Sequence, residues 1–199
     1  MSLSHILLGF LREPASGYDL KRTFERSVRH FWSAELSQIY PTLKRMEAEG
    51  WLSSTTEPSA RGPDRRVYAT TPAGCAELER WLAGGPSLGT ERFAYLAQLF
   101  FMDALDDPAV TLDFMRALRD RLAVWRAELE AIEAEIERRA PGFPDQLPDR
   151  VFNQHATLRM GLHTLSARLA WCDETIDRLN RRMAGRASVR ETAGAVKEA

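Results

Sequence analysis

The stretch Ser37–Glu47, with the sequence SQIYPTLKRME, and the Gly50–Leu52 step after it decide how this chain folds. The apolar residues Ile39, Leu43 and Met46 are spaced by four and three, which places them on one side of a helix. The other side carries small and hydrogen-bonding side chains, namely Ser37, Gln38, Tyr40, Lys44 and Arg45. The stretch therefore predicts a short helix with one anchored face and one polar face.

The start of this helix is indicated by two residues. Ser37 is a suitable N-cap, because its hydroxyl can accept a hydrogen bond from a free backbone N–H of the first turn. Pro41 has no backbone N–H and is tolerated only near the first turn. Together they predict that the helix starts close to Ser37.

Two more helices precede it. Apolar residues recur at helical spacing from Leu3 to Leu11, and Pro14 ends that helix. Ser16 and Asp19 have the spacing of a capping box, which starts a second helix. Its inward-facing residues are Leu20, Phe24 and Val28. Three helices in so few residues, the last two joined by a short connector, predict a helix-turn-helix arrangement.

A basic hairpin is predicted directly downstream. The runs 51–56 and 66–70 are rich in Thr, Val and Tyr and are typical of strands, and turn residues fill the loop between them. Three basic residues lie on or beside this loop: Arg61, Arg65 and Arg66. Thr71 and Pro72 then start a fourth helix as its cap and first residue. A helix with a polar face, followed by a basic hairpin, suits the major groove of DNA.

Beyond a glycine-rich linker at 84–89 the pattern becomes that of long helices. An apolar helix is predicted from Phe93 to Leu105, and two heptad series follow, separated by a proline-rich break. Two such series joined by a short loop predict an antiparallel helical hairpin with apolar surface to spare, which is typical of a dimer. The predicted parts are residues 1–83, a linker at 84–91, a helical domain at 92–184 and a flexible tail at 185–199.

Composition excludes several classes of protein. The formal net charge is −1 and the pI is near 6.4, so the total does not indicate nucleic acid, although basic residues gather between 21 and 29 and acidic ones between 128 and 137. The four histidines have no zinc-binding spacing, and no nucleophile elbow or phosphate-binding loop is present, which argues against an enzyme, a metal site or a cofactor. Two isolated cysteines predict buried, reduced thiols, and the short apolar N-terminus cannot span a membrane. A cytoplasmic protein is expected.

Several linked motifs resemble one family. They are SGYDL at 16–20, SQIYPTLKR at 37–45, EG at 49–50, GPDRRVY at 62–68 and TPAG at 71–74. In this order and spacing they resemble the PadR family of bacterial transcriptional regulators over residues 3–82, and the rest is similar, more loosely, to the helical C-terminal domain of its larger members. The resemblance implies a winged helix-turn-helix, a dimer held by C-terminal helices, and repression relieved by a ligand.

The expected DNA contacts follow from placing the third helix in the major groove. Ser37, Gln38 and Tyr40 would then meet base edges or phosphates, and Gln38 has the groups to bind adenine through two hydrogen bonds. The backbone would be held by Lys44, Arg45, Lys21 and Arg22. The hairpin arginines suit phosphates or a narrow minor groove, namely Arg61, Arg65 and Arg66. For the residues on helices the alternative is a solvated surface, and Tyr40 has the further alternative of packing against Trp51.

The second half offers two further hypotheses. One is a pocket for a small aromatic or anionic effector, with these candidate residues: Arg92, Trp125, His155, Arg159 and Trp171. The favoured alternative is a core histidine satisfied by a neighbour, with tryptophans filling an interface. The residues expected to hold the dimer are Leu158, Leu162, Leu165, Leu169, Ile176 and Leu179.

The sequence therefore predicts a mainly α-helical chain with a small β-wing. An N-terminal winged helix-turn-helix would be followed by a C-terminal antiparallel helical hairpin that dimerises as a coiled coil. The expected partners are a palindromic double-stranded DNA operator, a second copy of the chain and a small effector, and repression is the expected outcome. The alternative is a winged-helix protein-interaction module without operator binding; the basic residues on the groove-facing elements argue against it.

Overall fold

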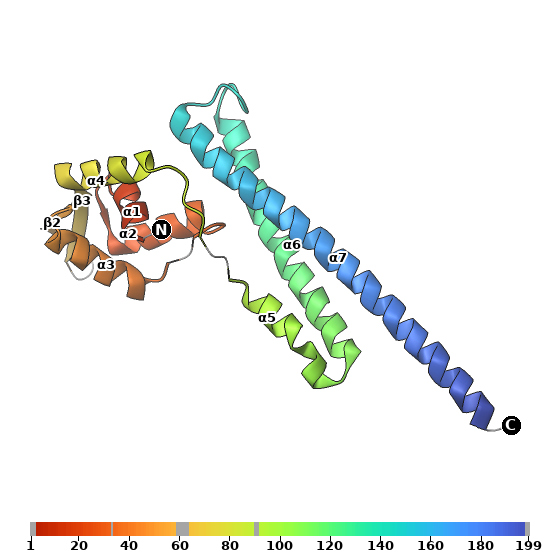
Figure 1. Cartoon of the computed structure of the whole chain (residues 1–199). Helices are drawn as coiled ribbons and strands as arrows, with labels where there is room; N and C mark the ends of the chain where they lie inside the picture. Colours follow the sequence, from red (N-terminus) through yellow and green to blue (C-terminus); the bar gives the residue numbers. More distant parts are fainter. Residues whose placement is uncertain (1–2, 33, 59–63, 90–91, 198–199) are drawn as a thin grey trace. The chain divides into compact units, whose positions relative to one another are not determined.

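The computed structural model describes residues 3–32, 34–58, 64–89 and 92–197, with side chains described up to residue 185. The chain, drawn in Figure 1, divides into two compact units, Met1–Glu91 and Arg92–Ala199. Each unit has its own hydrophobic core. The elements of the first unit are α1 (Leu3–Phe10), β1 (Ala15–Ser16), α2 (Gly17–Thr23), the π-helical turn η1 (Phe24–Val28), α3 (Leu36–Ala48), β2 (Leu52–Glu57), β3 (Arg65–Thr70) and α4 (Pro72–Ala83). Those of the second are α5 (Ala94–Phe100), the 3-10 turn η2 (Met102–Leu105), α6 (Pro108–Arg139) and α7 (Asp149–Lys197).

The first unit is a helical cluster built around a single core. Side chains from α1, α2, η1, α3 and α4 meet there, and several are fully buried: Leu7, Leu8, Leu20, Phe24, Ile39, Leu43 and Met46. The predicted inward positions of the second and third helices are therefore confirmed. Each Å² of apolar surface removed from water stabilises the fold by about 25 cal/mol, so this core is the main stabilising contribution to the unit.

A three-stranded antiparallel sheet closes this unit in the order β1–β3–β2. Strands β2 and β3 form the predicted hairpin, in a register that pairs Ser54 with Tyr68 and Thr56 with Arg66. The short strand β1 pairs with the other edge of β3 and was not predicted, because two residues are too few to show an alternating pattern.

Two of the predicted caps are present, and one start position is corrected. The Ser16 hydroxyl accepts from the Asp19 amide, and the Asp19 carboxylate accepts from the Ser16 amide, which is a capping box. The Thr71 hydroxyl caps α4 by accepting from the Gly74 amide.

Helix α3, however, starts at Leu36 with Glu35 as N-cap, not at Ser37. The Gln38 side chain accepts from the Glu35 amide at 3.1 Å and so adds residues to the start of the helix. Pro41 consequently lies in the second turn, where it has no N–H to donate to the carbonyl of Ser37.

The second unit is dominated by the hairpin of α6 and α7, in which α6 lies beside the first part of the longer α7 (Figure 1). The ion pair between Arg119 and Asp173 near one end and the hydrogen bond between Glu133 and His155 near the other show that the two helices are antiparallel, as predicted. Their shared core is formed by Met115, Leu122, Leu129, Leu158, Leu162, Leu165 and Cys172. The mainly α-helical class with a small β-wing is thus confirmed.

Two local predictions about these regions are corrected. The expected helix from Phe93 to Leu105 is interrupted at Phe101, whose backbone leaves the helical range (φ −109°, ψ 14°), and it resumes as the turn η2. The backbone of α7 is helical to Lys197, and the flexible tail expected at 185–199 stays a prediction. Cys172 is buried as expected, but Cys75 is exposed, since the inward-facing residues of α4 are Gly74 and Leu78.

In the described ranges no helix combines the length and apolar character needed to cross a bilayer, since the long helices carry many charged residues.

Candidate nucleic-acid interface

Helix α3 is held firmly from one side and open on the other. Ile39, Leu43 and Met46 are each 0% exposed, so rotation or withdrawal of the helix would open a cavity in the core. At 100° per residue, the opposite side of the helix carries Ser37, Tyr40, Pro41, Lys44 and Ala48, all exposed. The predicted two-faced helix is therefore present in the folded chain.

Tyr40 lies at one edge of this outward face, where its ring is supported by a glycine of α2. An ideal Cβ on Gly17 would lie 2.5 Å from Cε1 of Tyr40, closer than real contacts allow, so the ring lies directly on the bare backbone at the start of α2. Tyr40 remains 48% exposed. The ring therefore packs against α2, and the predicted alternative of packing on Trp51 does not describe this contact.

Two of the expected contact residues on α3 differ in availability. Lys44 makes no hydrogen bond or ion pair with any residue in the described part of the chain. Arg45 instead donates to the hydroxyl of the buried Ser4 at 2.7 Å, with Glu49 3.7 Å away, so its guanidinium is directed toward α1. Lys44 is thus the α3 cation best placed to meet a ligand.

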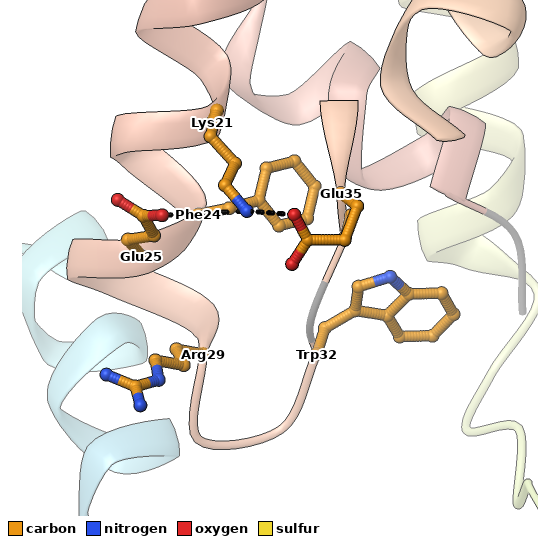
Figure 2. Close-up of a pocket in the computed structure, with 7 residues that line it drawn as sticks. Lys21, Phe24, Glu25, Arg29, Trp32 and Glu35 are labelled. Atoms are coloured by element: carbon orange, nitrogen blue, oxygen red, sulfur yellow. Dashed lines mark hydrogen bonds and ion pairs between the residues drawn. The ribbon is translucent and has the colours of Figure 1, made fainter. Parts of the chain in front are cut away.

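Lys21 on α2 lies between two carboxylates. Its Nζ atom donates to Glu35 at 2.5 Å and lies 3.5 Å from Glu25, and the hydrogen bond to Glu35 raises the pKa of the lysine (Figure 2). Figure 2 shows this pair in the wall of a pocket that Arg29 and Trp32 also line. The lysine therefore ties α2 to the start of α3, while its neighbour Arg22 is exposed.

The two described hairpin arginines are each held by a carboxylate. Arg65 lies 3.0 Å from Asp19 at the start of α2. Arg66 donates to both oxygens of Glu47 on α3, at 2.8 and 2.7 Å, and its Nε donates to the Ser54 hydroxyl at 2.9 Å. Consecutive residues of a strand point to opposite faces, which is why neighbouring arginines reach different helices. Arg61 lies outside the described residues.

Both carboxylates are stabilised in their charged form. Hydrogen bonds from Ser16, first from its side chain, lower the pKa of Asp19, and Arg65 adds to the effect. The hydroxyl of Ser54, followed by the guanidinium of Arg66, lowers the pKa of Glu47.

Three residues of this surface were not predicted from the sequence. Tyr18 in the first turn of α2 is 61% exposed, which is unusual for an aromatic ring, and its place between the two residues of the capping box is the one sequence signal that points to it. Glu47 and Ser54 were missed because their partnership with Arg66 joins residues far apart in the chain.

The candidate effector residues do not come together in the second unit. His155 is 8% exposed, its Nε2 lies 2.9 Å from Glu133, and its ring meets Phe143 edge to face. Arg159 also reaches Glu133, at 3.3 Å. Trp171 lies sixteen residues after His155 along α7, which is about 24 Å at 1.5 Å per residue.

The remaining candidates lie elsewhere in that unit. Trp125 packs on the hairpin core eight residues from Glu133, and Arg92 is exposed ahead of α5. The structure thus gives the histidine an acidic neighbour and forms no common pocket from the five residues.

The expected dimer residues divide into two groups. Leu158, Leu162 and Leu165 are 6% exposed or less because α6 of the same chain covers them. The other members are only partly buried: Leu169, Ile176 and Leu179. Large apolar side chains are instead exposed elsewhere on the unit, at Leu96, Phe100, Phe101, Leu105, Val110, Val124, Ile132, Phe152 and Met160.

Known proteins share both units of this chain. Residues 6–80 match the Transcriptional regulator PadR-like family, and residues 91–180 match Virulence activator alpha C-term. The chain is 32% identical to the "Probable transcriptional regulator Rv1176c" of Mycobacterium tuberculosis, over 90% of this chain and 98% of that one.

Two solved proteins have a similar fold. Bacillus subtilis PadR in complex with operator DNA superposes with a TM-score of 0.71 at 24% identity, over 89% of this chain and 98% of that one. The same protein has been solved with p-coumaric acid, with a TM-score of 0.66 at 24% identity over 89% and 95% of the two chains. The Vibrio cholerae virulence activator AphA gives 0.68 at 27% identity over 91% and 99%.

A winged helix-turn-helix followed by a helical hairpin, with an open polar face on α3, defines a DNA-binding regulator of transcription. The chain belongs to the PadR-like family of transcriptional regulators. The family resemblance drawn from the motifs is confirmed, and this family is not a class of enzymes.

Proposed function

We propose that the protein binds a palindromic operator as a homodimer and represses transcription until a small aromatic or anionic effector binds. The observation that carries the proposal is the open face of α3, on which Ser37, Tyr40 and Lys44 are exposed while the opposite face is fixed in the core. A helix held in this way can enter the major groove without being displaced.

Contacts to bases would come from the start of α3. Ser37 and Tyr40 are placed to meet base edges or phosphates. Gln38 can bind adenine through two hydrogen bonds only if its amide oxygen leaves the Glu35 amide, and that amide is then free to bind a phosphate. The cations assigned to the DNA backbone are Lys21, Arg22, Lys44, Arg45, Arg61 and Arg65.

Dimerisation rests on the apolar surface of the second unit. Phe100 and Phe101 are 78% and 67% exposed, beside Leu105 at 56%. Such a cluster is stabilised when a second copy covers it. In a two-fold dimer the two α3 helices would meet half-sites about 10 bp apart or a multiple of that spacing, which is why a palindrome is expected.

Repression and effector control are supported by the relatives. Bacillus subtilis PadR is named a negative transcriptional regulator, and it has been solved with both operator DNA and p-coumaric acid. We therefore place the protein on bacterial chromosomal DNA in the cytoplasm. A small planar acid is the first effector to test.

The test is selection of random duplexes by the purified protein, with the Tyr40→Ala, Lys44→Ala double variant as control. Enrichment of a palindrome by the wild type, absent in the control, is the expected result. Enrichment of a single asymmetric half-site would contradict the dimer, and no enrichment would favour the protein-interaction alternative. Adding p-coumaric acid to the selected complex then tests whether a planar acid releases the DNA.

A further inference from the structure

The two neighbouring arginines of the wing are held in different ways, and this difference carries an inference that rests on the proposed function. Arg65 and Arg66 carry the same charge, lie on the same strand and have similarly exposed side chains, at 51% and 54%. Their partners, however, lie on different helices, Asp19 on α2 and Glu47 on α3.

Arg66 belongs to a closed ring of hydrogen bonds. It donates through Nη2 to both oxygens of Glu47 and through Nε to Ser54. The Ser54 hydroxyl in turn donates to Glu47 at 2.6 Å. The ring therefore joins β2, β3 and α3, and the guanidinium also lies over the Tyr68 ring, 5.5 Å from its centroid. The planar fork of an arginine suits this two-sided arrangement, whereas the single ammonium of a lysine does not.

Arg65 has a partner that can release it. Asp19 already accepts hydrogen bonds from the amide and the hydroxyl of Ser16, at 3.0 and 2.6 Å. If Arg65 turned toward a phosphate, Asp19 would keep both of these donors. If Arg66 turned away, Glu47 would keep only Ser54, whose hydroxyl would itself lose the donor from Arg66. Exchange of a carboxylate for a phosphate is therefore much easier at Arg65.

We propose that Arg66 is a positioning residue that fixes the wing to helix α3 through Glu47 and Ser54, and that Arg65 is the arginine of the pair that binds phosphate. The ring sets the distance between the wing and the helix in the major groove. Arg66 therefore supports operator binding by fixing this distance and makes no phosphate contact of its own. This assignment replaces the DNA contact that was expected of Arg66 from the sequence.

Glu47→Ala separates this proposal from the simpler view that Glu47 merely shields Arg66 from DNA. The change removes a negative charge close to the proposed DNA surface and frees Arg66. If Arg66 bound phosphate, the variant would bind operator more tightly. If Arg66 acts through Glu47, the variant binds about tenfold more weakly, as Arg66→Ala does, and the double variant is no weaker than either single one.

The salt dependence of binding provides the second measurement, with Arg65→Ala as matched control. The slope of log K against log salt is negative, and removing one phosphate contact reduces its magnitude by about 0.9. Full-length variants are titrated with the selected operator by fluorescence anisotropy over roughly 50 to 200 mM salt, well below their melting temperatures. Arg65→Ala should flatten the slope, while Arg66→Ala and Arg66→Lys should weaken binding at an unchanged slope. A flattened slope in Arg66→Ala, or full activity in Arg66→Lys, would overturn the proposal.

Hydrogen exchange of the wing strands β2 and β3 tests, without DNA, whether the Arg66–Glu47–Ser54 ring holds the wing to α3. The amides of β2 and β3 should exchange faster in Glu47→Ala and Arg66→Ala than in the wild type or in Arg65→Ala. Equal exchange rates in all four proteins would refute the positioning role of Arg66, even if the operator is bound. Failure of the wild type to select any duplex would instead refute the proposed function, so the two failures are distinguishable.

Discussion

Replacing Gly17 by alanine tests whether Tyr40 must lie on the bare backbone of α2 to act in the groove. The added methyl would come within 2.5 Å of Cε1 and 2.8 Å of Cζ of Tyr40, so the ring has to move. It has room to move, because 48% of the residue is exposed. The clash is therefore expected to displace a DNA contact and leave the fold intact.

The two effects of this substitution have different magnitudes. Alanine favours a helix over glycine by at most about 1 kcal/mol, which offsets part of the steric cost, so the free energy of unfolding should change by less than about 1 kcal/mol. A single hydrogen bond contributes about 0.5–1.5 kcal/mol and would be made once in each half-site, so operator affinity should fall about tenfold. Urea melts measure the first quantity, and anisotropy titrations with the selected duplex measure the second.

A double-mutant cycle with Tyr40→Ala gives the decisive control. If Gly17→Ala acts only by displacing the ring, it should have no effect on operator affinity once the ring has been removed. An equal loss of affinity in both backgrounds would show that the substitution disturbs the start of α2 itself, and it would refute the assigned role of the Gly17–Tyr40 contact.

Three further predictions concern charge, the hairpin and acid. Lys44→Ala should weaken operator binding about tenfold and lower the salt slope by about 0.9 per half-site, and an unchanged slope in the titration would contradict a phosphate contact. Leu165→Asp should unfold the α6–α7 hairpin, because this 2%-exposed side chain lies in the core of its own chain; loss of helical signal in circular dichroism is expected, and a folded monomer by light scattering would contradict it. Because Ser54 and Arg66 hold the pKa of Glu47 below its ordinary value of 4.5, the pairing stabilises the fold above that pH, and this contribution is lost as the pH falls through the lowered value. Urea melts between about pH 7 and about pH 3 should show that loss, and Glu47→Gln should show less of it than the wild type.

The features that the sequence predicted well are local. Spacings of three and four fixed the inward face of α3, and the capping box at Ser16 and the Thr71–Pro72 start were visible because a cap acts within three residues. Glu35 was missed as the cap of α3, because glutamate is not among the preferred N-cap residues and it is Gln38 that completes the cap.

The features that escaped prediction join distant residues. No spacing rule connects Arg66 with Glu47, nineteen positions earlier, so a basic loop looked like a set of free cations. The heptad pattern of α7 predicted an apolar seam correctly, but such a pattern does not say which chain supplies the opposite helix. Leu158, Leu162 and Leu165 are covered from within, and the exposed aromatic pair Phe100 and Phe101 belongs to no heptad.

The self-pairing of the basic side chains around α3 has a consequence for how the protein would search a chromosome. Lys21, Arg45, Arg65 and Arg66 are each engaged by a group of their own chain, and the formal charge of the whole molecule is −1. Attraction to unrelated sequence depends on free cations, so residence there should be brief and sliding distances short. Occupancy of the operator would then depend on the fit of the protein to the groove, to which the wing held by Arg66 and the Tyr40 ring supported by Gly17 would contribute.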